Sequence, residues 1–143
     1  MGRWRSPMGA IVTRPAVLGT SHVAVVTRDL HSSERFYVGV LGLPVLVRYE
    51  DEAGKHRSTW VGLDGAFLAL ERASAEGPQR ADVAPGLHCL ALRIRAGDRN
   101  AWRTHLAAQG VVIERESKFS LYVRDPDGVL VGLSHYPDES PAI

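Results

Sequence analysis

Short stretches of alternating apolar and polar residues are separated by turns along this chain, and two longer stretches have helical periodicity. A period of two predicts strands and a period near 3.6 predicts helices. The first half predicts a strand at 18–27, a helix at 29–42, and strands at 45–50, 57–63 and 66–72. The second half predicts a strand at 87–95, a helix at 98–109, and strands at 111–114, 119–124 and 129–136. Each half is therefore strand, helix and three strands, which indicates an α+β fold.

The two halves also repeat one another in sequence. GTSHVAVVTRDLHSSERFYVGVLGL, from Gly19 to Leu43, is similar to GLHCLALRIRAGDRNAWRTHLAAQG, from Gly86 to Gly110. His22 and His88 therefore open equivalent strands. The Val-rich strand after His22 is expected to be buried on both faces. A supersecondary unit that occurs twice predicts a pseudo-twofold relation between the halves.

A second pair of segments repeats near the end of each half. LDGAFLALER aligns with PDGVLVGLSH, which matches Ala69 with Gly132 and Glu71 with Ser134. If a pseudo-twofold axis relates the halves, these positions and the two opening histidines converge near that axis. A concave, mostly apolar cavity with a few polar groups is typical of a small-molecule site.

The pattern predicts one domain built from both halves, because neither half is long enough to bury its own sheet. The expected organisation is a flexible N-terminal arm at 1–17, a domain at 18–137 made of modules 18–72 and 87–136, a linker at 73–86, and a tail at 138–143. The open sheets leave edges and apolar surface, so we expect a homodimer.

Composition narrows the classes of partner. The chain has 143 residues, with 17 basic and 16 acidic side chains and a formal net charge of +1. This balance predicts neither a nucleic-acid partner nor a membrane surface, and leaves a small molecule or a protein as the expected partner. The start of the chain lacks the apolar run of a signal peptide, so a cytoplasmic location is expected. Cys89 is expected to be a core residue.

Alternation also assigns side chains to faces. Ser120 and Tyr122 are predicted to point away from the helices, and so are Ser58 and Trp60 on the third strand. With Phe67 on the fourth strand, Trp60 would form an aromatic wall of the cavity.

The doubled unit, with HVAVVTRDLHSSERFYVGVLGL in the first copy and YVRDPDG before the last strand, resembles the vicinal oxygen chelate superfamily. That superfamily includes glyoxalase I, extradiol dioxygenases and bleomycin resistance proteins. The resemblance covers about residues 18–137. It implies tandem βαβββ modules that form a curved mixed sheet around a central cavity.

The resemblance also implies where a metal would bind. In metal-dependent relatives the ligands are the opening His of each half, here His22 and His88, and acidic residues in the fourth strands. The acid positions are Ala69 and Gly132 in this chain, so both carboxylates are missing. Glu71 is the candidate for a displaced third ligand. The cofactor is then either one divalent ion, Fe²⁺, Mn²⁺, Ni²⁺ or Zn²⁺, or none.

Two functions follow as hypotheses. The first is a glyoxalase- or dioxygenase-type protein that binds or transforms a small oxygen-rich or aromatic molecule; as an enzyme it would be a lyase, isomerase or dioxygenase. The alternative is a metal-free protein that sequesters a ligand, as bleomycin resistance proteins do. The candidate catalytic residues are His22, His88 and Tyr122; the candidate substrate-binding residues are Trp60, Phe67, Ser120, Tyr122 and Ser134.

Overall fold

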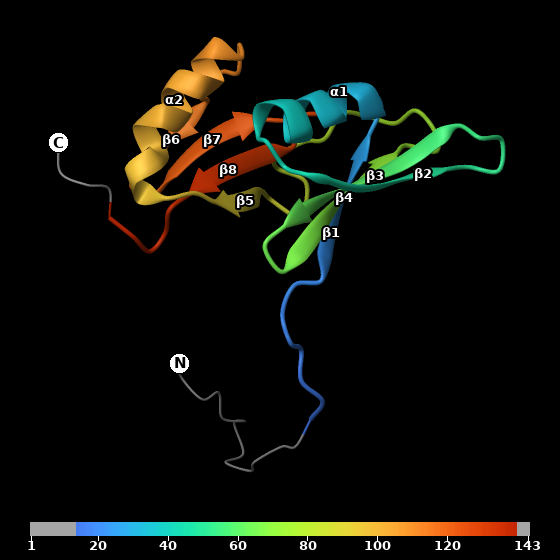
Figure 1. The fold of residues 1–143 in the computed structure, drawn as a ribbon, viewed down its shortest axis with the longest axis horizontal. Coiled ribbons are helices and arrows are strands. Elements are labelled where there is room, and N and C mark those ends of the chain that lie inside the picture. The colour runs from blue at the N-terminus through green and yellow to red at the C-terminus, as the bar shows by residue number, and fades with distance from the viewer. Residues whose placement is uncertain (1–13, 140–143) are drawn as a thin grey trace.

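Two four-stranded sheets and two main helices make up the fold (Figure 1). The computed structural model describes residues 14–139. The first half comprises β1 (His22–Thr27), α1 (Leu30–Glu34), η1 (Arg35–Val40), β2 (Val45–Glu50), β3 (His56–Leu63) and β4 (Ala66–Arg72). The second comprises β5 (Leu90–Arg93), η2 (Ala96–Asp98), α2 (Arg99–Ala108), β6 (Arg115–Glu116), β7 (Ser120–Arg124) and β8 (Leu130–Ser134).

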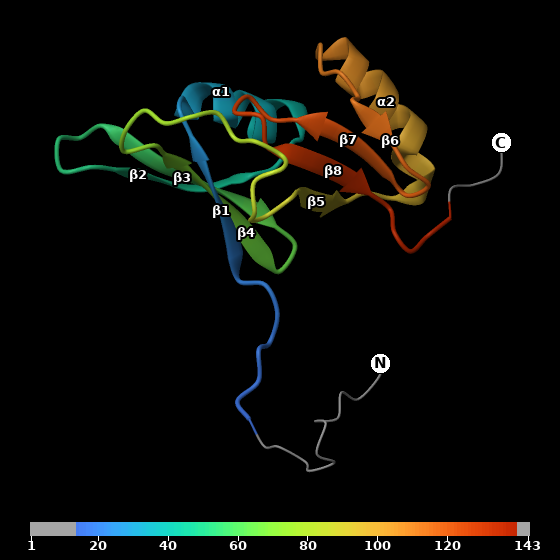
Figure 2. The ribbon, with the colours of Figure 1, turned by 180° about the vertical axis from the view of Figure 1, so that it is seen from behind.

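The two sheets have the same topology. Their strand orders are β1-β4-β3-β2 and β5-β8-β7-β6. In each sheet the first strand of the half pairs parallel with the last, and the other pairs are antiparallel. Figures 1 and 2 show both helices on the same side of the molecule. The α+β fold of two repeated units is confirmed.

The first helix begins where the sequence predicts it. Asp29 is its N-cap, and the carboxylate accepts a hydrogen bond from the His31 N–H at 3.1 Å. After one turn the helix widens into the π-helix η1, and the segment ends near Gly42, whose φ of 76° suits a residue without a side chain. The predicted helix at 29–42 is therefore present, with a change of winding halfway.

One hydrophobic core joins the two halves. Alternate residues of the central strands face the helices, so Val61 and Leu68 of the first sheet and Leu121 and Val131 of the second are fully buried. The same core cluster contains Phe36, whose ring lies on the helical segment. Sharing one interior gives each short module the buried area that it lacks alone.

The turn between β7 and β8 binds the first module through hydrogen bonds. The buried Tyr37 hydroxyl donates to Asp125 Oδ2 at 2.8 Å. Asp127 Oδ2 accepts from the Thr27 hydroxyl at 2.6 Å, and Asp127 Oδ1 accepts from the Arg28 N–H at 3.1 Å. The DPDG sequence is thus a contact between modules as well as a turn.

Three sequence predictions are wrong in detail. Cys89 is exposed, because it lies just before β5 beside the gap between the modules. The first strand is an edge strand that buries only one face, so Val26 is 62% exposed. Residues 111–114 form no strand; the pairing with β7 begins at Arg115. The part of the predicted arm at 1–13 and of the tail at 140–143 lies outside the described residues.

Candidate functional site

Four rings lie side by side on the face of the first sheet that points away from the helices. The His22 ring on β1 stacks on Phe67 of β4, with centroids 4.7 Å apart and planes 9° apart. Phe67 stacks on Trp60 of β3 at 4.3 Å, and Tyr49 of β2 meets Trp60 edge to face at 5.1 Å. We call these four residues the aromatic row. Each ring fixes its neighbour, since such pairs contribute about 0.5–1.5 kcal/mol beyond their burial.

The aromatic row follows from strand register. Thr59 and Val61 point to the helix side, so Trp60 between them points away. Trp60 pairs with Ala69, whose small side chain leaves room for the indole ring. The Trp60 indole N–H is buried and has no acceptor within residues 14–139. Ring contacts rather than a hydrogen bond therefore orient this side chain.

The equivalent face of the second sheet carries Tyr122. A Cβ atom added to Gly132 would lie 3.2 Å from Tyr122 Cε1 and 3.8 Å from the Ala91 Cα, so the tyrosine ring occupies the space beside this glycine. The Arg115 guanidinium carbon lies 4.4 Å from the centroid of the same ring. The Tyr122 ring therefore lies between the backbone at Gly132 and the guanidinium group of Arg115.

Two predicted hydroxyl residues share that face. Ser120 and Ser134 pair in register across β7 and β8. The Ser134 hydroxyl accepts a hydrogen bond from the Tyr136 N–H at 3.3 Å, and Ser120 is buried. They lie one row away from Tyr122, which pairs with Gly132.

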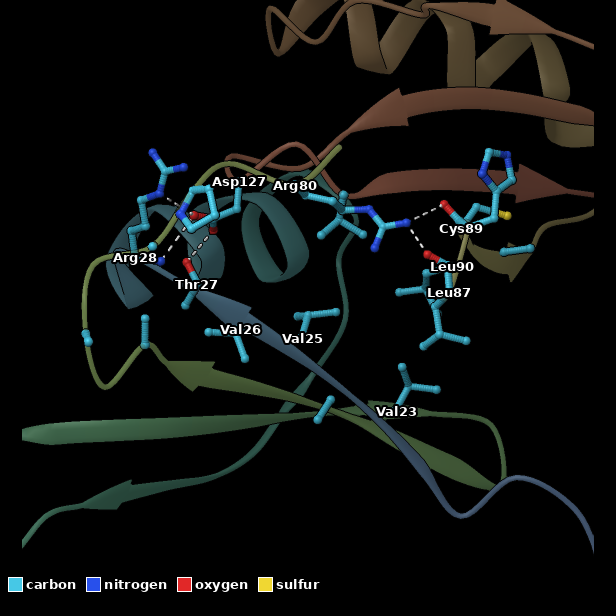
Figure 3. A pocket seen from close by; sticks show the side chains of 18 residues that line it. Val23, Val25, Val26, Thr27, Arg28, Arg80, Leu87, Cys89, Leu90 and Asp127 are labelled. Carbon is cyan, nitrogen blue, oxygen red and sulfur yellow. Dashed lines mark hydrogen bonds and ion pairs between the residues drawn. The ribbon is translucent and has the colours of Figure 1, made fainter. Parts of the chain in front are cut away.

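An apolar cavity of about 490 Å³ lies between the facing edges of β1 and β5 (Figure 3). It is lined by residues 23–28, residues 87–91, Asp127, Val129 and five linker residues between Ala73 and Arg80. We call it the intermodule pocket. Its size and apolar lining are typical of small-ligand sites.

Polar groups line two parts of the intermodule pocket. The Arg80 guanidinium donates to the carbonyl oxygens of Leu87 and His88, which ties the linker to the start of the second module (Figure 3). Asp127 lies in another part of the pocket lining, and its carboxylate accepts hydrogen bonds from the Thr27 hydroxyl and the Arg28 N–H. The two groups frame an apolar centre.

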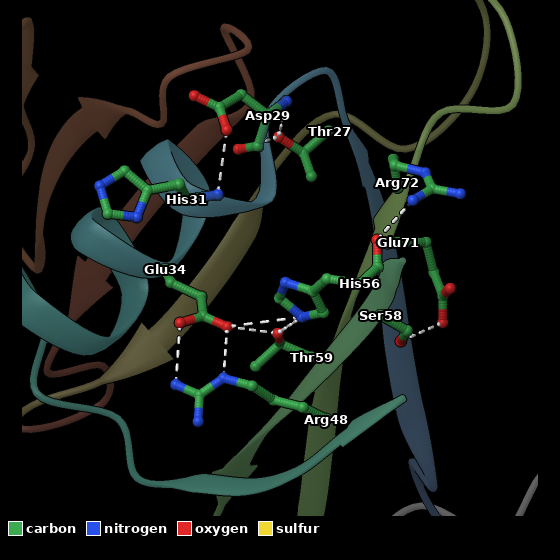
Figure 4. A network of polar contacts seen from close by, with 10 residues as sticks. All are labelled: Thr27, Asp29, His31, Glu34, Arg48, His56, Ser58, Thr59, Glu71 and Arg72. Atoms are coloured by element: carbon green, nitrogen blue, oxygen red, sulfur yellow. Dashed lines mark hydrogen bonds and ion pairs between the residues drawn. The ribbon is translucent and has the colours of Figure 1, made fainter. Parts of the chain in front are cut away.

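A polar network supports the first sheet on its helix side (Figure 4). Glu34 of α1 accepts two hydrogen bonds from the Arg48 guanidinium, both at 2.9 Å, and one from the Thr59 hydroxyl. His56 Nε2 lies 2.7 Å from Thr59 Oγ1. The hydrogen bonds from Arg48 hold the pKa of the Glu34 carboxyl below its usual range. This network fixes β2 and β3 behind the aromatic row.

The proposed metal ligands do not form a metal site in the described chain. His22 stacks on Phe67, and its Nδ1 lies 3.1 Å from the Ser21 hydroxyl oxygen. Glu71 Oε1 accepts from the Ser58 hydroxyl at 2.9 Å. His88 is exposed in the wall of the intermodule pocket. Within residues 14–139, no three His, Cys, Asp or Glu side chains lie close enough to hold an ion.

Sequence reasoning grouped Trp60 with Phe67 on one face, and the structure brings both together with His22. It did not single out Arg115, Arg80 or Asp127. Asp127 could have been found, because two aspartates flank the proline of the DPDG turn and one is free to bind another segment. Arg115 could not, since its strand was placed several residues too early.

Comparison with known proteins identifies the relatives of this fold. The sequence profile of the Glyoxalase/Bleomycin resistance protein/Dioxygenase superfamily matches residues 19–133. A search of curated proteins finds no match. Among solved structures, a glyoxalase/dioxygenase from Nostoc punctiforme is 19% identical with a TM-score of 0.74, over 90% of this chain and 98% of that chain.

Fosfomycin resistance proteins have the same fold. FosX from Listeria monocytogenes, in a complex with Mn(II) and a sulfate ion, is 16% identical with a TM-score of 0.66, over 84% of this chain and 93% of that chain. FosX from Mesorhizobium loti is 18% identical with a TM-score of 0.66, over 83% and 92%. Together with the profile, which spans most of both modules, these findings show that the chain belongs to the Glyoxalase/Bleomycin resistance protein/Dioxygenase superfamily.

Proposed function

We propose that this protein binds a compact, planar, aromatic or oxygen-rich molecule where the aromatic row meets the intermodule pocket. The observation that carries the proposal is the stack of Trp60 and Phe67, which ends in His22 on the edge strand β1. Val23, the next residue, already lines the intermodule pocket. A planar ligand at this edge would extend the stack by one ring and fill the apolar cavity.

The histidines and Tyr122 supply polar groups for such a ligand. In the tautomer in which Ser21 donates to His22 Nδ1, the Nε2 atom carries the proton and can donate to a ligand oxygen. His88 lines the intermodule pocket from the other module. If the protein is an enzyme, proton transfer by His22, His88 and Tyr122 is the chemistry that these residues offer. If it is not, the same groups orient a sequestered ligand.

A metal-dependent enzyme is the second candidate function. The paired positions of His22 and His88 and the Mn(II) bound by the related FosX favour it. The missing carboxylates at Ala69 and Gly132 count against it, and so does the hydrogen bond that engages Glu71. Elemental analysis after incubation with Mn²⁺, Fe²⁺, Ni²⁺ and Zn²⁺ distinguishes the metal-dependent function from the metal-free one. About one ion per chain, lost in His22→Ala, would support the second candidate.

We further propose that the protein works as a homodimer. β1 and β5 each pair on one side only, and Val26 and Leu87 beside them are 62% and 74% exposed. A second copy would cover this apolar surface and close the open side of the ligand site. A cytoplasmic location remains a prediction from the sequence. No helix within residues 14–139 has the length and apolar character needed to cross a bilayer.

Quenching of tryptophan fluorescence tests the ligand site. We expect 2-naphthalenemethanol to quench the wild-type protein, because its fused rings can stack at the His22 end of the aromatic row. Phe67→Leu should weaken binding about tenfold through loss of the stack. Trp102→Phe, on α2 and away from the row, is the matched control and should leave the affinity unchanged. Equal affinity in the Phe67 and Trp102 variants would contradict the proposal.

A further inference from the structure

The linker at 73–86 forms one wall of the intermodule pocket. It runs from the end of β4 to the start of β5 (Figures 2 and 3), and five of its residues, between Ala73 and Arg80, line the cavity. Most of the remaining lining comes from residues 23–28 and 87–91 of the two modules. The position of the linker therefore determines how far the pocket is enclosed.

Few backbone hydrogen bonds hold the linker. The Ala73 N–H donates to the Thr27 carbonyl oxygen at 2.9 Å, where the linker leaves β4. Beyond this point, the linker of the described chain has one backbone hydrogen bond, from the Ala84 N–H to the Ala81 carbonyl oxygen at 3.2 Å. All residues at 74–86 are exposed. A segment with so little burial and backbone pairing can open while the sheets stay folded.

Two side-chain contacts shape the linker near the second module. The Arg80 guanidinium donates to the carbonyl oxygens of Leu87 and His88, seven and eight positions later. Both acceptors precede β5, so these bonds close a short loop and attach no strand. The Gln79 side chain lies against the turn between β7 and β8, since a Cβ atom added to Gly128 would be 3.1 Å from Gln79 Nε2.

Within residues 14–139, one ion pair attaches the linker to a strand. Asp82 accepts two hydrogen bonds from the Arg124 guanidinium of β7, at 2.8 and 2.7 Å. They hold the pKa of the Asp82 carboxyl below its usual range, so this carboxylate is charged at neutral pH. The Asp82 side chain is 46% exposed and that of Arg124 is 28% exposed. A pair so open to water is weak enough to break and form again.

We infer that the linker is a movable wall of the intermodule pocket and that the ion pair between Asp82 and Arg124 holds this wall closed. The inference rests on the proposed ligand site and adds the step by which a ligand enters and leaves it. Within the described chain, Asp82 and Arg124 lie outside the pocket lining. They are positioning residues, because they act on the wall and not on the ligand.

Stopped-flow quenching by 2-naphthalenemethanol tests the movement. Asp82→Asn should raise the association and dissociation rate constants together, about two- to fivefold, because the wall opens more often. The dissociation constant should stay unchanged, since the ion pair stabilises the closed wall with and without the ligand. Glu114→Gln is the matched control: it removes the other carboxylate bound by Arg124 and leaves Asp82 in place. Unchanged rate constants in Asp82→Asn, or an equal rise in Glu114→Gln, would overturn the inference.

Trypsin cleavage after Arg80 tests the wall without any ligand. Arg124→Gln keeps the sequence of the linker, and we expect about two- to fivefold faster cleavage than in the wild type, measured by mass spectrometry of the fragments. Glu114→Gln should be cleaved at the wild-type rate. Equal cleavage of all three proteins would overturn the inference and leave the ligand site standing. Failure of the probe to bind would overturn the proposed function, and cleavage after Arg80 would then decide alone whether the wall moves.

Discussion

At the scale of single residues, Tyr37 and Asp125 show how much one buried contact can matter. Tyr37 is fully buried, and its hydroxyl donates to a carboxylate that is only 6% exposed. Burial and the neighbouring Asp125 raise the pKa of the tyrosine. The hydroxyl therefore stays protonated above the ordinary tyrosine range and keeps its proton for Asp125.

We expect Tyr37→Phe to lower the free energy of unfolding by about 1–3 kcal/mol, because Asp125 Oδ2 would lose its partner while still buried. Urea denaturation measures the change. Tyr49→Phe is the matched control, since Tyr49 is 36% exposed and its hydroxyl has no hydrogen bond within the described residues. A loss of the same size in both variants would contradict the role of the Tyr37 contact.

Asp125 should make the stability depend on pH. Burial raises the pKa of its carboxyl, although hydrogen bonds from Val129, Tyr37 and Asp127 oppose the shift. A raised pKa in the folded state means that the folded protein holds this proton more tightly than the unfolded chain. The free energy of unfolding should therefore fall as pH rises from the ordinary aspartate value through the raised one.

The comparison with Asp125→Asn isolates this effect. The amide oxygen can still accept from the Asp127 and Val129 N–H groups, which both donate to Oδ1. We expect urea denaturation between about pH 4 and pH 7 to show a smaller fall in the variant than in the wild type. Parallel pH profiles would show that Asp125 does not titrate in this range.

At the scale of elements, the network around Glu34 joins α1 to β2 and β3. The Glu34 side chain is 19% exposed and Arg48 is 53% exposed, so the ion pair itself should contribute less than about 1 kcal/mol. Its function is to fix two strands whose opposite face carries Trp60 and Tyr49. The hydrogen bonds of Glu34 thus help to fix the positions of β2 and β3, the strands that carry Tyr49 and Trp60.

Glu34→Gln should destabilise the protein at neutral pH and have less effect in acid. The pKa of Glu34 is lowered by Arg48, so its stabilisation is present above the ordinary glutamate value and is lost as pH falls through the lowered one. Thermal unfolding at about pH 7 and about pH 3 measures the difference. Glu50→Gln on β2 is the control, as Glu50 makes no ion pair within residues 14–139.

The elements were the most predictable part of this protein. Alternation placed Trp60 and Tyr122 on the faces where the structure has them, because period two leaves only one choice once Val61 and Leu121 are buried. The π-helix and the shift of β6 were not predictable, since both depend on tertiary contacts. The stacking of His22 on Phe67 depends on register between strands 45 residues apart, which no local pattern specifies.

At the scale of the whole molecule, two modules share one core, and each sheet keeps its first strand, β1 or β5, at an edge. The edges of β1 and β5 face each other across the intermodule pocket without forming one sheet. The exposed apolar side chains on this side are the surface that we assign to a second copy. The sequence predicted such a surface from the open sheet edges, but not which residues form it.

Val26→Lys should disrupt the proposed homodimer, because it places a charge at an exposed position of an edge strand. We expect light scattering after size exclusion to give the mass of two chains for the wild type and of one chain for the variant. Val112→Lys, at a residue 78% exposed in the other module, is the control and should remain dimeric. A wild-type protein that is monomeric at micromolar concentration would rule out the dimer.

The hydrogen bonds of the DPDG turn also bear on how the protein is made. Tyr37 and Thr27 are synthesised early, but their partners Asp125 and Asp127 lie 88 and 100 positions later. At a synthesis rate of about 5–20 residues per second, roughly 5–20 s pass between the synthesis of Tyr37 or Thr27 and that of its partner. During that interval the Tyr37 hydroxyl lacks its native partner Asp125. The nascent first half therefore depends on the last third of the chain to become native.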